Sequence, residues 1–291
     1  MSNKQKAILL MVVSTLSFSF MQLIVKIAGP DIPTMEKVFF RNFITLFLGL
    51  FLVFKDKAPI FGKKENRLAL LCRSVFGFIG VAGYFYATNN MNVADASLLH
   101  RSSPFFVIIF SAIFLRNRLT RVQISALLLA FVGSVLVINP SFNVNVLPAL
   151  VGLISAAGAG GAYVIINYLK GKESNSTIVF CFSLVSCTLS ALMSGSDFIM
   201  PNGIQWVMLL GIGIFAGVGQ IALTQAYKMT NPGEVSIINY LGIIFSAILG
   251  FVFLNERIST RSFIGIALIL TAALLLYFMK NSKEIGRSKA A

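Results

Sequence analysis

The feature that most constrains this chain is a series of ten apolar segments, each long enough to cross a membrane. A helix rises about 1.5 Å per residue, so a hydrocarbon layer of about 30 Å needs roughly 20 apolar residues. Backbone groups in lipid must bond within their own segment, which a helix achieves. We therefore expect an all-α membrane protein with ten transmembrane helices. The segments cover residues 6–28, 34–54, 67–89, 93–115, 121–139, 147–168, 175–195, 203–227, 233–254 and 259–279.

Composition agrees with this class. The chain is 57% hydrophobic and 12% charged over 291 residues. A net charge of +14 would suggest nucleic-acid binding in a soluble protein, but the basic residues lie between apolar runs, with no aromatic-basic platform or helix-turn-helix pattern. We expect a lipid bilayer and no nucleic acid around the chain. Its oligomeric state, monomer or homodimer, is left open.

The positions of lysine and arginine predict the orientation, because cytoplasmic loops carry an excess of these residues. With the N-terminus in the cytoplasm, seventeen of the 24 basic residues fall on the inner side, and the outer side receives only Lys37, Arg257 and Arg261. An even number of spans then places both termini in the cytoplasm. We expect a multi-pass protein of the cell (plasma) membrane. The other four basic residues, Lys26, Arg41, Arg73 and Arg101, lie inside spans.

The second half of the chain repeats the first. Each copy contains five spans, an odd number, so the two copies must cross the membrane in opposite orientations. We place the copies at residues 1–140 and 141–291. Inverted repeats are typical of secondary transporters, whose substrate site lies near the midplane between the copies. A shift of 139 residues aligns Asp95 with Glu234, Phe106 with Phe245, His100 with Asn239 and Arg101 with Tyr240.

The fourth span carries most of the chemistry. Arg101 lies eight residues inside it, about 12 Å deep, where an unpaired arginine costs several kcal/mol. Pro104 has no amide hydrogen for the carbonyl of His100, so we expect one spanning helix with a kink at the proline. Broken backbone at this depth is tolerated where it lines a cavity. The sequence therefore predicts that Arg101 and His100 face a substrate site.

The other cations allow two interpretations. Lys26, Arg41 and Arg73 lie close enough to span ends for their side chains to reach a membrane interface, or they line the same cavity. Asp95 and Glu234 lie near helix ends and are interpreted as helix-end acids or as substrate or proton groups. No acid in the sequence lies as deep as Arg101. We expect a positive cavity that attracts an anion or the carboxylate of a zwitterion.

Local signals support the segment boundaries and the packing. Asn231, followed by a proline and then Glu234, predicts a helix start, and Thr120 with Gln123 predicts a capping box. The run Ser155-Ala-Ala-Gly-Ala-Gly-Gly161 lets helix backbones approach closely. These small residues serve either static packing between helices or a contact along which two helices slide.

No motif for covalent chemistry accompanies these segments. The sequence shows no P-loop, no metal-ligand cluster and no spaced nucleophile, base and acid, and it has one histidine. We expect no enzyme activity and no cofactor. The cysteines, Cys72, Cys181 and Cys187, are interpreted as small buried side chains.

Several motifs resemble those of the EamA family in the drug/metabolite transporter superfamily, over essentially the whole chain. They are R-S-x-x-G-F-x-G-x-x-x-Y-F-Y-A from Arg73, V-A-D-A-S from Val93, and S-P-F-F from Ser103. They are similar to those of the branch with bacterial uptake carriers for S-adenosylmethionine and riboflavin. Phe39-Phe-Arg-Asn42 and Asn255-Glu-Arg257 also match. The chain departs from the family at Arg116-Asn-Arg118, where Gly-Glu-Arg is usual. The resemblance implies ten helices, two inverted repeats and a central cavity formed mainly by spans one, three, four, six, eight and nine.

Taken together, these features predict a secondary transporter that moves a small polar metabolite, either carboxylate-bearing or zwitterionic, such as an amino acid derivative or a vitamin. The alternatives are an exporter of toxic amphiphilic compounds and a non-transporting membrane partner. The predicted substrate-binding residues are Arg101, His100, Asn239, Tyr240, Arg41, Arg73, Tyr84, Tyr86, Tyr163 and Gln225.

The predicted topology can be tested with fusions. A reporter that is active only in the cytoplasm should be on when it is fused after Lys289, because ten spans return the chain to the inner side. The same reporter should be off when it is fused between Asn139 and Leu147, after five spans. The same signal from both fusions would contradict either the count of ten or the inverted repeat.

Overall fold

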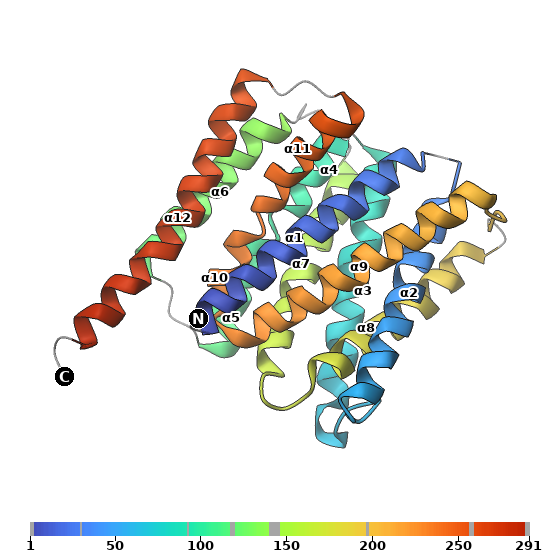
Figure 1. Ribbon diagram of the computed structural model, residues 1–291, viewed down its shortest axis with the longest axis horizontal. Helices are drawn as coiled ribbons and strands as arrows, with labels where there is room; N and C mark the ends of the chain where they lie inside the picture. Colours follow the sequence, from blue (N-terminus) through green and yellow to red (C-terminus); the bar gives the residue numbers. More distant parts are fainter. Residues whose placement is uncertain are drawn as a thin grey trace.

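In a computed structural model, the protein is described over residues 3–29, 31–91, 93–116, 120–139, 146–195, 198–255 and 259–288. Within these ranges every regular element is a helix, which confirms the all-α class (Figure 1). The elements are α1 (Asn3–Ile27), α2 (Thr34–Lys55), a short 3-10 turn (Lys64–Asn66), α3 (Arg67–Asn90), α4 (Val93–His100), α5 (Ser103–Leu115), α6 (Arg121–Ile138), α7 (Val146–Tyr168), α8 (Asn175–Ser194), α9 (Gly203–Met229), α10 (Pro232–Ile238), α11 (Leu241–Leu254) and α12 (Thr260–Ser288).

The apolar segments of the sequence correspond to these helices. Nine stretches in the described ranges are long and apolar enough to cross a membrane, with α4 and α5 together forming one and α10 and α11 another. The tenth segment lies on α12, whose apolar part spans Thr260–Leu275. Exposed phenylalanines such as Phe47, Phe51 and Phe54 recur along one face of α2, as expected where lipid replaces water.

The fourth and ninth spans are broken. We predicted one continuous helix kinked at Pro104, and this prediction is wrong, because α4 ends at His100 and α5 begins at Ser103. Pro104 lies in the first turn of α5, where its missing amide hydrogen breaks no bond. The ninth span divides in the same way between α10 and α11.

The break in the second copy forms without a proline. The shift of 139 residues places Ile243 where the first copy has Pro104. Around Asn239 and Tyr240 the backbone bonds span three residues, for example from Tyr240 N–H to the carbonyl of Ile237 at 3.1 Å and from Gly242 N–H to that of Asn239 at 3.1 Å. Such 3-10 bonds tighten the chain and interrupt the α-helical pattern. The break therefore belongs to the repeated architecture, and the proline only accommodates it.

The helices pack with the two-fold symmetry that an inverted repeat requires. Helix α1 packs on α9 as α7 packs on α3, and α1 meets α11 as α7 meets α5. Helices α2 and α8 pair at one flank of the bundle, and α6 and α12 pair at the other (Figure 1). The broken spans lie between these flanks. This pattern places the two breaks near the centre of the molecule.

Local signals read from the sequence also hold. Thr120 and Gln123 form a capping box at the start of α6, with the Gln123 N–H 3.3 Å from Thr120 Oγ1 and the Thr120 N–H 2.9 Å from Gln123 Oε1. Asn231 caps α10 by accepting the N–H of Gly233 at 3.0 Å. Asn92, Glu256 and Arg257 lie outside the described residues.

Small residues bring the α7 backbone against its neighbours, as the sequence predicted. A Cβ added to Gly158 would lie 2.9 Å from the carbonyl oxygen of Phe76 and 3.1 Å from the Gly80 nitrogen on α3. A Cβ added to Gly161, one turn later, would meet its nearest atom at an ordinary 3.7 Å. Close packing of α7 on α3 therefore depends on Gly158 and not on Gly161.

This difference predicts opposite outcomes for two substitutions on the same helix. Gly158→Ala should lower stability by about 1–3 kcal/mol, because the new methyl group meets α3 backbone that cannot rotate away. Gly161→Ala is the matched control and should be neutral or slightly stabilising, because alanine favours the helix. Thermal unfolding of the purified variants measures both. Equal melting temperatures would contradict the packing of α7 on α3.

Candidate substrate-binding site

A cavity of about 650 Å³ lies between the two copies. Residues from α1, α3, α4, α5, α7, α9 and α11 line it, as does the break between α10 and α11, so the six spans that the family resemblance implied all contribute. The cavity is also lined by two spans that the resemblance did not include, through Thr34, Lys37 and Arg41 of α2 and Phe182 of α8. Such a volume suits a small metabolite.

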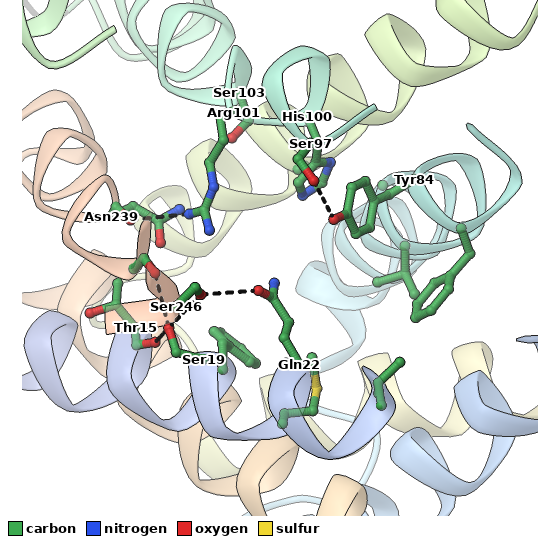
Figure 2. A pocket seen from close by; sticks show the side chains of 18 of the residues that line it. Thr15, Ser19, Gln22, Tyr84, Ser97, His100, Arg101, Ser103, Asn239 and Ser246 are labelled. Carbon is green, nitrogen blue, oxygen red and sulfur yellow. Dashed lines mark hydrogen bonds between the residues drawn. The ribbon is translucent and has the colours of Figure 1, made fainter. Parts of the chain in front are cut away.

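The two helix breaks are joined across the centre of the molecule. Arg101 Nη1 donates to the carbonyl of Asn239 at 3.2 Å, and the hydroxyl of Tyr240 donates to the carbonyl of Arg101 at 2.8 Å. Arg101 and Tyr240 are equivalent positions of the repeat, so each break supplies a side chain to the backbone of the other. We call this pair of bonds the cross-brace; its Arg101 bond is drawn in Figure 2.

A glycine allows the guanidinium of Arg101 to lie close to α11. A Cβ added to Gly242 would lie 3.3 Å from Arg101 Nη1 and 3.5 Å from Nη2, and 3.5 Å from Thr15 Cβ. Arg101 therefore lies between the second break and α1, on the wall of the cavity. Its bond to Asn239 places a cation at the C-terminal end of α10, which the helix dipole favours.

His100 is held by a short chain of hydrogen bonds. The hydroxyl of Ser155 donates to the carbonyl of Gly80 at 2.9 Å, and His100 Nδ1 lies 2.7 Å from the same hydroxyl oxygen. Because the hydroxyl hydrogen is already used, Nδ1 must be the donor in that contact. A neutral His100 then carries its hydrogen on Nδ1 and presents Nε2 as an acceptor. The contact fixes the orientation of the ring and directs Nε2 away from Ser155.

Tyr84 completes this part of the wall. Its ring lies 4.6 Å from that of His100, centroid to centroid, and its hydroxyl is 3.1 Å from Ser97 Oγ (Figure 2). Aromatic contacts of this kind fix both rings in position.

The arginines of α2 and α3 turn inward and do not extend to a membrane interface. Arg41 is 7% exposed, lines the cavity and donates to Asn42 Oδ1 at 3.2 Å. Arg73 is 1% exposed, and its guanidinium carbon lies 4.0 Å from the ring centroid of Phe182. The interpretation that these cations only reach toward the interface is therefore wrong for this structure.

Two buried carboxylates are engaged at loops, away from these arginines. Glu173 Oε1 accepts the backbone N–H of Lys63 at 2.8 Å and Asn66 Nδ2 at 2.7 Å, while Glu36 Oε2 accepts the N–H of Ile199 at 3.1 Å. Each bond joins the two copies: Glu173 lies in the loop between α7 and α8, and Glu36 lies in the first turn of α2. These acids hold the two copies together near the ends of the spans.

The structure gathers most of the predicted site residues around the cavity. Tyr86 does not line it and is 38% exposed, and neither Gln225 nor Arg73 is among the residues on its wall. Arg73 lies behind two residues that are, Gly77 and Phe182. The predicted residues that line the cavity are Arg41, Tyr84, His100, Arg101, Tyr163, Asn239 and Tyr240.

Sequence reasoning missed a polar stripe on α1. Thr15, Ser19 and Gln22 all line the cavity. Ser246 on α11 faces them, with its Oγ 3.1 Å from Ser19 Oγ and 3.3 Å from Gln22 Oε1 (Figure 2). The spacing of four and three residues marks one helix face, so a search for polar residues at helical spacing within the first span would have found them.

Comparison with known proteins assigns the class. The family model of the EamA-like transporter family matches residues 5–139 and again residues 146–278. The chain therefore belongs to the EamA-like transporter family and is a membrane transporter. The two matches fit the repeated packing of the helices.

Individual relatives cover nearly the whole chain. The pseudopaline exporter CntI of Pseudomonas aeruginosa is 35% identical over 274 residues, covering 94% of this chain and 96% of the relative. A riboflavin transporter of Brucella anthropi is 26% identical and covers 88% and 92%. A solved crystal structure superposes with a TM-score of 0.82 at 19% identity, over 94% of this chain and 96% of the other, and it supports the fold.

The cross-brace predicts a specific effect of Tyr240→Phe. Losing the hydroxyl leaves the Arg101 carbonyl unpartnered at a helix break, which should lower stability by about 1–3 kcal/mol. The matched control is Tyr168→Phe, which removes a hydroxyl from an exposed tyrosine on α7. Thermal unfolding of both purified variants is the measurement. The cross-brace would be refuted if the two variants unfolded at the same temperature.

Proposed function

We propose that the protein is a secondary transporter that moves a small polar metabolite with at least one carboxylate across the plasma membrane by alternating access. The inverted packing of the copies and the central cavity support this mechanism, because transporters of this architecture bind cargo where their copies meet. The division at residues 140 and 141 and the cytoplasmic location of both termini stay predictions.

The charge of the cavity supports an anionic group on the cargo. Arg41 and Arg101 lie on its wall, and Lys26 and Lys37 lie toward its end. At the two breaks the N-termini of α5 and α11 add positive potential, and the C-terminal ends of α4 and α10 add negative potential, so the arginines set the sign of the charge. The carboxylates of Glu36 and Glu173 bond to loop backbone instead. A site with this charge favours a carboxylate over an organic cation.

The lining of the cavity extends to one end of the spans, and apolar side chains pack at the opposite end. Lining residues reach Thr34 at the start of α2 and Leu254 at the end of α11. Toward the start of α1, Met11 belongs to a buried apolar cluster, and the rings of Tyr163 and Tyr227 stack at 4.7 Å. With the N-terminus in the cytoplasm, as we expect, this arrangement supports a state that faces the outside.

We propose export as the direction of transport. The support is the 35% identity to an exporter over nearly the full length of both chains. Export of toxic amphiphilic compounds is the competing function. A strain that lacks the protein should accumulate an endogenous carboxylate-bearing metabolite in its cytoplasm, whereas a change only in resistance to amphiphilic drugs would favour the competing function.

The observation that carries this proposal is Arg101 on the cavity wall at a helix break, and substitutions test it. If its planar guanidinium binds a carboxylate through two parallel bonds, Arg101→Lys keeps the charge but loses that geometry and should weaken binding substantially. Arg101→Ala should lower affinity by about ten- to a hundredfold, corresponding to about 1.5–3 kcal/mol. Affinity is measured on purified protein with the substrate found by a thermal-shift screen.

Affinity in variants that remain folded separates a binding arginine from a purely structural one. Arg101 also donates to the carbonyl of Asn239, so its variants should lose some stability in either case. A purely structural Arg101 would leave the affinity of the folded variants unchanged. An Arg101→Ala protein of normal stability and unchanged affinity would remove Arg101 from the site and, with it, the main reason for an acidic or zwitterionic substrate.

A further inference from the structure

Arg73 is the largest fully buried side chain of the described residues, and its guanidinium is not satisfied. It is 1% exposed, and neither Nε nor Nη1 has a hydrogen-bond partner. Its contact is with the face of Phe182, 4.0 Å from the ring centroid. A cation–π contact offsets part of the loss of water, but it leaves the N–H groups of Nε and Nη1 without acceptors.

Such an arrangement is unfavourable for folding. A buried charge is normally paired or hydrogen-bonded, because transfer from water carries a large penalty. A methionine or leucine would fill the same space between α3 and α8 without that penalty. An arginine that the fold does not use is a candidate for a group that the working protein uses at another step.

The guanidinium lies directly behind the cavity wall. A Cβ added to Gly77 would lie 2.7 Å from Arg73 Nη1 and 2.8 Å from Phe182 Cε2, and both Gly77 and Phe182 line the cavity. Tyr163, on the same wall, lies within electrostatic reach of Arg41, Arg73 and Arg101. The ring of Phe182 and the backbone at Gly77 therefore lie where the Arg73 guanidinium comes close to the cavity wall.

We propose that Arg73 is a second carboxylate-binding position, which the cargo reaches when the Phe182 ring turns away from the guanidinium. The cargo then carries at least two carboxylates, one held at Arg101 and one at Arg73. This inference rests on the proposed function, because it places both carboxylates in the same transported molecule. The unpartnered Nε and Nη1 lie on different sides of the guanidinium, and each offers an N–H that a carboxylate oxygen can accept.

The first test needs no ligand. In Arg73→Met, an apolar side chain of similar length replaces the unsatisfied cation, and the melting temperature of the empty protein should stay the same or rise, by about 2–4 °C. An arginine that stabilises the fold would behave in the opposite way. A clear fall in melting temperature would overturn the proposal.

The second test measures selectivity for the second carboxylate. Purified wild type is titrated with glutarate, adipate and pimelate, each beside its own monoamide, and thermal stabilisation is recorded. At least one diacid should act at a concentration about tenfold below that of its monoamide, and Arg73→Met should abolish this advantage while it still responds to the monoamide. A diacid advantage that is absent in the wild type, or that persists in Arg73→Met, would count against the proposal.

A second variant keeps the arginine in place. Gly77→Ala puts a methyl group against Arg73 Nη1 and the Phe182 ring, so it should also remove the diacid advantage. Gly161→Ala on α7 is the matched control and should preserve it. Inorganic phosphate and chloride are titrated in a separate experiment. If either ion stabilises the wild type but not Arg73→Met, and no diacid advantage is seen, then Arg73 binds an inorganic anion. That result would overturn the carboxylate assignment.

The failures of the two proposals are distinguishable. If Arg101→Ala abolishes binding of diacids and monoamides while Arg73→Met changes neither, the transporter binds a single carboxylate and only the second position is lost. If Arg101→Ala binds both probes normally, Arg101 does not bind a carboxylate, and the proposed function loses the observation that carries it.

Discussion

The structure depends on how two interrupted helices satisfy their backbone groups inside a membrane. Lipid offers no hydrogen bonds, so a free carbonyl at the middle of a span is strongly unfavourable. Here each break supplies what the other lacks, because Tyr240 donates to the carbonyl of Arg101 and Arg101 donates to that of Asn239. The breaks can therefore exist only where the two copies meet. That requirement places irregular backbone, a cation and a polar cavity at the same point.

Acidic and basic side chains occupy different parts of the molecule. Glu36 and Glu173 bond to loop N–H groups and join the copies near the ends of the spans. The arginines lie deeper, where Arg41 and Arg101 meet the cavity and Arg73 is buried beside Phe182. A chain selected for stability alone would pair these cations or replace them with apolar side chains. Keeping the acids apart from the arginines leaves the centre positive, as the proposed binding of an anion requires.

Much of this architecture follows from the sequence, and the limits have physical causes. The helical segments, the repeat and the alignment of Arg101 with Tyr240 are recognisable because apolar periodicity and sequence similarity record them. Helical periodicity also separates Tyr84 from Tyr86. Two residues correspond to about 200° around a helix, so the two side chains point to opposite faces and only Tyr84 lines the cavity. The inward direction of Arg73 and the break that forms without a proline depend on contacts between helices distant in the sequence, and no local pattern records them.

The repeat also explains why the site is not symmetric. Two arginines at equivalent positions would place two cations at one point and would leave no hydroxyl to donate to the first break. The chain instead pairs Arg101 with Tyr240 and His100 with Asn239, so one copy contributes the charge and the other contributes neutral groups. In the cross-brace, Arg101 uses Nη1, one nitrogen of a guanidinium that carries five N–H donors. Symmetric backbone thus builds the cavity, and the departures from symmetry in its side chains place the lysines and arginines of its wall in the first copy.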